Sequence, residues 1–174
     1  MFGSTLKRGC SRKAIALAGL VLAFAVLSPA SALAKAGGTD RPMKGSGTGT
    51  ITLNPVTGAF TGVVPGVSSH LGNVTVQIEG TGVRLSDGSF AGSGTTTLVA
   101  ANGDQLTGTM TLTQTVLPTG RTTTTVAVTI TGGTGRFADA SGTLTVICES
   151  GPPDLVDGLL LIKAECKFTG QVSY

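Results

Sequence analysis

The chain has 174 residues and a formal net charge of +3, with 40% hydrophobic and only 12% charged residues. Four of its basic residues lie within the first 13 positions, where there is no acidic residue, and the remainder carries slightly more acidic than basic residues. Binding to nucleic acid requires a clustered positive face, and this distribution excludes one. No nucleic acid is therefore expected as a partner.

The N-terminal segment has the pattern of a secretory signal peptide. Residues 1–13 are basic, residues 14–27 form an unbroken apolar run, and small residues follow at Ala32 and Ala34. This pattern predicts a signal at 1–34, cleavage after Ala34 and Sec-type export to an extracellular or periplasmic location. The apolar run is shorter than the roughly 20 residues that span a bilayer. An uncleaved N-terminal anchor is the alternative, and no membrane span is predicted in the mature chain.

Residues 35–174 suit one domain, because about 140 residues can bury a single core. This part contains 27 threonines and many glycines, and it shows no helical periodicity. Threonine favours strands, and glycine interrupts them. We predict a flexible mature N-terminus at 35–46 and a β-barrel domain at 47–174. The bias toward Ala, Gly and Thr favours a bacterial source.

Alternation of apolar and hydroxyl residues marks the strands. In "DQLTGTMTLTQTV" the even positions include Leu106, Met110 and Leu112, whereas the odd positions from 107 to 115 are all threonine. Such a strand has one apolar face and one wet face. Similar patterns predict eight strands, near 47–53, 59–64, 70–80, 89–99, 104–116, 121–132, 142–149 and 159–172.

Short turn sequences separate most of these strands. "NPVTG", "SDG", "ANGD" and "PTGR" are typical of loops that join neighbouring antiparallel strands. A weak repeat between the segments that start at Gly47 and Gly92 has the length of one hairpin. We therefore predict an all-β fold, a single eight-stranded antiparallel up-and-down barrel of calycin-like type. A two-sheet β-sandwich is the alternative.

The stretch "TGGTGRFADASGTLTV" (131–146) lacks the features of a phosphate-binding loop. No Lys-Ser or Lys-Thr pair follows its glycines, and the spacing leaves room for one helical turn at most. We interpret it as a tight turn in which Gly132, Gly133 and Gly135 permit positive φ and Phe137 folds back as a plug over one barrel mouth.

The same stretch resembles the G-G-T-G-x-F turn, with A-x-G and a strand after it, of the allene oxide cyclase and dirigent barrel superfamily. "SSHLGNVTV" and "NGDQLTG" are similar to segments of its uncharacterised secreted bacterial members, and the resemblance spans most of the mature chain. It implies an eight-stranded barrel. The plant members are a cyclase of an unsaturated fatty-acid epoxide and proteins that guide phenoxy radical coupling, but their polar cavity residues match no positions here.

Five residues are candidates for ligand binding. His70, the sole histidine, shares the inward parity of Val74, Val76 and Ile78, and Thr96 and Gln114 also lie on inward parity. Met110 on the inner face and the plug residue complete the set, which is His70, Thr96, Gln114, Met110 and Phe137. The alternatives are a histidine that binds a loop carbonyl, and polar residues that satisfy one another.

Cys148 and Cys166 are predicted to form a disulfide, because Cys10 is lost with the signal and an exported chain permits oxidation. If the last two strands pair with these cysteines opposite each other, Val146 meets Phe168 and Leu144 meets Gly170. Two free buried cysteines are the alternative.

The residue inventory offers no usual zinc site, no G-x-S-x-G elbow and no calcium loop. We therefore predict no metal and no cofactor. Three functions remain open: binding of a small apolar ligand in the barrel, which we favour; an isomerase or cyclase of the type that the resemblance implies; and a structural or surface-interaction role. Whether the chain is an enzyme stays open, and the sequence does not determine its oligomeric state.

Overall fold

The structure, a computed structural model, describes residues 38–174. The predicted signal peptide and its cleavage site lie outside the described residues. The chain order of the elements is β1 (Asp40–Leu53), β2 (Ala59–Ser68), β3 (Gly72–Arg84), β4 (Phe90–Ala100), β5 (Gln105–Val116), β6 (Thr122–Gly133), the single-turn 3-10 helix η1 (Gly135–Phe137), β7 (Ser141–Ser150), β8 (Asp154–Val156) and β9 (Leu159–Ser173).

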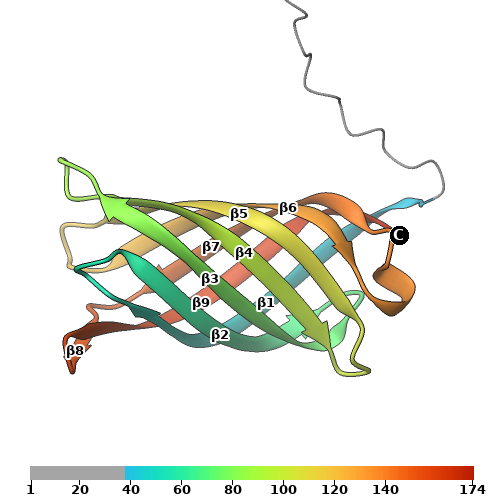
Figure 1. Cartoon of the computed structure of the whole chain (residues 1–174), viewed down its shortest axis with the longest axis horizontal. Coiled ribbons are helices and arrows are strands. Elements are labelled where there is room, and N and C mark those ends of the chain that lie inside the picture. The colour runs from blue at the N-terminus through green and yellow to red at the C-terminus, as the bar shows by residue number, and fades with distance from the viewer. Residues whose placement is uncertain (1–37) are drawn as a thin grey trace, which may run out of the picture. The chain divides into compact units, whose positions relative to one another are not determined.

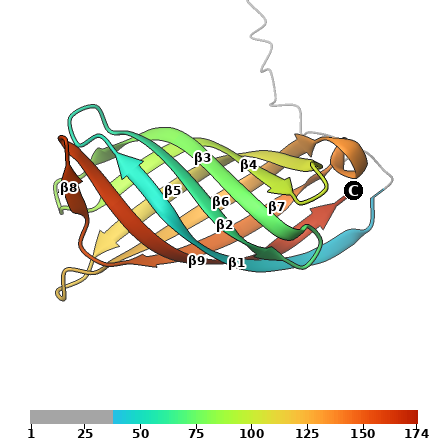
Figure 2. The ribbon, with the colours of Figure 1, turned by 90° about the horizontal axis from the view of Figure 1, so that it is seen from below.

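Eight of the nine strands form a closed antiparallel barrel (Figures 1 and 2). Each strand pairs with the next along the chain from β1 to β7, β7 pairs with β9, and β9 returns to pair with β1. The last pairing runs from Asp40 opposite Ser173 to Leu53 opposite Leu160 and closes the sheet on itself. The predicted up-and-down barrel is confirmed, and the sandwich is excluded.

The inner and outer faces follow the predicted alternation. In β5, Met110 is only 4% exposed, whereas its neighbours Thr109 and Thr111 are exposed. Inward apolar side chains lie opposite inward positions of the adjacent strand, as where Met110 lies opposite Val128. This matching keeps most apolar side chains inside and most threonine hydroxyls in water, which fixes the register of each pair.

Strand β1 begins seven residues before the predicted barrel domain, so the expectation of a flexible segment at 35–46 is wrong for residues 40–46. Met43 in this segment is 1% exposed and lies opposite Gly170 of β9. Glycine occupies the next inward position, Gly45, because a Cβ there would collide with the Phe168 ring. An inward face made of glycines has no apolar alternation, so the sequence pattern does not show it.

Strand β8 is an addition to the eight predicted strands. Its residues 154–156 pair with residues 159–161 of β9 through a two-residue turn at Asp157 (φ 50°) and Gly158 (φ 79°). Two positive φ values are the requirement of a type I′ hairpin turn, and the Asp-Gly dipeptide satisfies it. The proline pair at 152 and 153 separates this hairpin from β7, so it extends from one end of the barrel (Figure 1).

The two ends of the barrel differ. One end holds η1, the C-terminus and the β2–β3 and β4–β5 turns, and we call it the plug end. The other holds the β1–β2, β3–β4 and β5–β6 loops and the β8 hairpin, and we call it the loop end (Figures 1 and 2). Within the described residues no helix is long and apolar enough to cross a membrane.

Candidate ligand-binding site

Phe137 closes the plug end. Its side chain is fully buried, and its ring meets that of Tyr174 edge to face with centroids 4.6 Å apart. The Arg136 guanidinium lies 4.7 Å above the Phe137 ring, donates a hydrogen bond to the His70 carbonyl and forms an ion pair with Asp104 at 3.6 Å. These contacts tie η1 to two other turns. The predicted plug is thus present.

His70 belongs to this closed end and not to the barrel interior. It lies in the turn between β2 and β3, and its Nε2 is 2.8 Å from the Pro42 carbonyl oxygen. The parity argument fails because β3 begins only at Gly72 and its alternation does not extend back into the turn. The expected inward position of His70 is corrected to the alternative, a histidine held by a backbone carbonyl.

A cavity of about 120 Å³ lies inside the barrel, and all eight barrel strands contribute to its wall. Most of its lining is aliphatic, including Ile51, Val76, Leu112, Val126 and Val146. Among the described residues that line it, none carries a charge. Met110, Thr96 and Gln114 are part of this wall, as predicted, whereas His70 and Phe137 are not.

Two phenylalanines pack across the inner wall of β3 and β4. Gly80 lies opposite Gly94 and Gly82 opposite Gly92, so these strands carry no side chains inward there. A Cβ at position 80 would come within 2.6 Å of the Phe60 ring, and one at position 82 within 2.5 Å of the Phe90 ring. The glycines therefore make room for the two rings, which meet edge to face with centroids 6.4 Å apart.

The disulfide between Cys148 and Cys166 forms part of the cavity wall. The two cysteines lie opposite each other on β7 and β9, with Val146 opposite Phe168 and Leu144 opposite Gly170. Both the predicted bridge and the predicted register are confirmed. Because the bond joins neighbouring strands from inside, it fixes them next to the last pairing that closes the barrel.

Polar side chains occupy one stretch of the inner wall. The Nε2 of Gln114 donates hydrogen bonds to the Thr122 and Thr124 hydroxyls, each at 3.3 Å, and the Thr122 and Ser150 hydroxyls are 2.5 Å apart. We call Gln114, Thr122, Thr124 and Ser150 the polar group. Thr96 is separate, because its hydroxyl donates to the Gln77 carbonyl at 3.3 Å. Gln114 and Thr96 thus bind different partners and do not satisfy each other.

Sequence reasoning missed Thr124 and Ser150, which both line the cavity. The parity of Val126 and Cys148 carried the signal, since Thr124 and Ser150 lie two residues from them on the same face. Within the run of four threonines at 122–125, however, hydroxyls occupy both faces. Alternation alone cannot distinguish an inward from an outward residue there.

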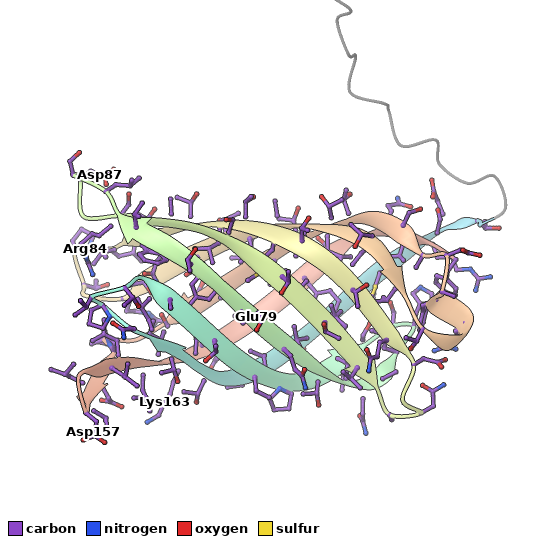
Figure 3. The ribbon with its side chains drawn as sticks, in the orientation of Figure 1. Glu79, Arg84, Asp87, Asp157 and Lys163 are labelled. Carbon is purple, nitrogen blue, oxygen red and sulfur yellow. A yellow bond between two sulfur atoms is a disulfide. The ribbon has the colours of Figure 1, made fainter. Side chains whose placement is uncertain are left out.

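Charged side chains lie outside the cavity (Figure 3). Glu79 is on the outer face of β3, where it accepts a hydrogen bond from the Thr95 hydroxyl, and Arg84, Asp87, Asp157 and Lys163 lie toward the loop end. Hydrogen bonds from the hydroxyl and the backbone N–H of Ser89 lower the pKa of Asp87. In the described part of the chain, no three His, Cys, Asp or Glu residues could hold a metal ion.

Comparison of the chain with protein-family models, curated proteins and solved structures finds no match. The resemblance to the allene oxide cyclase and dirigent superfamily therefore stays a prediction. The strand pairing alone establishes the fold. The residues around the cavity include a disulfide, hydroxyls and an amide, but no acid or base that could transfer a proton.

Proposed function

We propose that this protein is an exported barrel that binds a small apolar molecule in its interior. The observation that carries the proposal is the aliphatic cavity of about 120 Å³, enclosed by all eight strands. Side chains around an aliphatic cavity lack dispersion contacts on that side, and a ligand that fills the cavity supplies them. The signal-like pattern at residues 1–34 supports export.

The size of the cavity limits the ligand. An apolar cavity of roughly 150 Å³ accommodates benzene, and this one is slightly smaller. A molecule of about six non-hydrogen atoms is therefore the natural occupant, and a long acyl chain would have to displace wall residues. Approach to the cavity is from the loop end, since Phe137 and its neighbours fill the plug end.

Titration with methylcyclopentane, followed by NMR of the side-chain methyl groups, tests the proposal. We expect saturable shifts at cavity residues such as Val146 and Leu112. Val146→Phe, which fills the cavity, should abolish the shifts. Val63→Phe on the outer wall, where Val63 is 53% exposed, should leave them intact. Absence of shifts in the wild-type protein would overturn the proposal.

A second candidate, a surface-interaction role, is favoured by apolar side chains at the loop end. The exposed fractions of Val56 and Leu155 reach 91% and 70%. The exposed large apolar residues of this end are Val56, Val83, Leu85, Val116, Leu117, Leu155 and Val156. Exposed apolar residues that gather in this way are typical of surfaces that contact another molecule.

Sedimentation equilibrium tests this second candidate through self-association. The double variant Val56→Asp and Leu155→Asp should weaken association if the loop end is an interface. Val67→Asp, a change on the outer wall, is the matched control. A wild-type protein that stays monomeric at high concentration would exclude an interface between copies.

A further inference from the structure

The polar group is continuous across three neighbouring strands. Gln114 of β5 lies opposite Thr124 of β6, and Thr122 of β6 lies opposite Ser150 of β7. All four residues lie on inward parity, and Gln114, Thr124 and Ser150 line the cavity. The apolar cavity therefore has one hydrogen-bonding side.

The polar group has more hydrogen-bonding capacity than it uses. The Gln114 amide uses both N–H bonds on Thr122 and Thr124, and its carbonyl oxygen has no partner among the described residues. The contact between Thr122 and Ser150 uses the hydroxyl hydrogen of one of these two residues. The hydroxyl hydrogen of the other residue and that of Thr124 stay unused. The Gln114 carbonyl oxygen is not among the buried atoms without a partner, so it faces accessible space, and Thr124 and Ser150 line the cavity beside it.

The unused capacity consists of one acceptor, the Gln114 Oε1, beside donors on the threonine and serine hydroxyls. No charged side chain lines the cavity to compensate a carboxylate or an ammonium, and burial of an unpaired charge is costly. A ligand with a carbonyl group could accept a hydrogen bond from a hydroxyl of the polar group, but it would give the Gln114 oxygen no donor. A hydroxyl group donates and accepts at once, so it satisfies both sides.

We infer that the ligand is a compact aliphatic alcohol whose hydroxyl binds Gln114 and Thr124 while its hydrocarbon part fills the aliphatic cavity. This inference rests on the proposed function and specifies its ligand. The ligand hydroxyl donates to Gln114 Oε1 and accepts from the Thr124 hydroxyl. Thr96 takes no part, since its hydroxyl is bound to the Gln77 carbonyl.

The test compares cyclopentanol with methylcyclopentane, which have the same number of non-hydrogen atoms. Gln114→Met keeps the length of the side chain and removes its hydrogen bonds. The ratio of the two dissociation constants, alcohol over hydrocarbon, should rise roughly tenfold in this variant, as expected for the loss of one or two hydrogen bonds. Thr124→Val should raise the ratio in the same direction. Gln77→Met on the outer face is the control and should leave the ratio unchanged.

The outcomes separate this inference from the proposed function. If the hydrocarbon binds and neither Gln114→Met nor Thr124→Val changes the ratio, the ligand class is wrong and the proposed function stands. If neither compound shifts the wild-type spectrum, the proposed function fails and this inference fails with it. A ratio that rises in both variants and not in the control supports both.

Discussion

Cys148 lies directly opposite Cys166 on β7 and β9, and their sulfur atoms are bonded inside the barrel. The bond closes a loop with a sequence separation of 18, which in the chain-entropy model stabilises the fold by about 3 kcal/mol. The variant Cys148→Ala and Cys166→Ala should lose about this free energy of unfolding in urea titrations. Two free thiols per unreduced, unfolded wild-type chain would contradict the bond.

Met110→Asp should unfold the barrel, because it places an unpaired carboxylate among apolar side chains and costs several kcal/mol. Thr109→Lys, one residue away on the outer face, should change the free energy of unfolding by about 0.5 kcal/mol or less. Circular dichroism and thermal unfolding of the two proteins provide the comparison. Equal effects would mean that the two faces of β5 are assigned the wrong way round.

Phe137→Ala should lower the free energy of unfolding by about 3 to 5 kcal/mol, since it removes a fully buried ring from the plug end. The Phe137 side chain is not part of the cavity wall, so binding of methylcyclopentane should persist while the protein is folded. Chemical denaturation and ligand titration of one preparation measure both effects. Loss of binding with unchanged stability would show that the ring contacts the ligand and does not act as a plug.

Export predicts a mature chain that begins at Lys35. Sequencing of the N-terminus of the protein recovered outside the cytoplasm should find this residue. Detection of Met1 on a cell-associated product would favour the uncleaved anchor. The experiment concerns only the first 34 residues and does not depend on ligand binding.

The sequence predicted the parts of the fold in which alternation is unbroken. The alternation of threonine with leucine, valine and methionine identified β5. The shared parity of Cys148 and Cys166 predicted the correct register of β7 and β9. The pattern failed where glycine replaces the apolar residue, as at Gly45 in the first half of β1. It failed again at His70, because the direction of a turn residue depends on contacts such as the Pro42 carbonyl, which lies 28 positions away.

Candidate site residues were predictable where parity was unambiguous, as for Thr96, Met110 and Gln114. The hydrogen-bond partner of each residue was not predictable. Gln114 could have paired with Thr96 or with the threonines of β6, and only the register of β5 against β6 selects the latter. The polar group is therefore a product of two strand pairings, β5 with β6 and β6 with β7, that no local sequence pattern records.

The pairing of β1 with β9 means that the chain cannot complete its fold until nearly all of it is available. From β1 to β7, each strand pairs with the next one along the chain. The pairing of β1 with β9 instead brings together residues such as Asp40 and Ser173, which are 133 positions apart and hydrogen-bond to each other. A pairing between residues so far apart in the sequence slows folding, because the entropy of loop closure is lost before the contacts form. If the chain is exported with its N-terminus first, β1 and β9 cannot pair before the last strand has crossed the membrane. The barrel would then close only after export is complete.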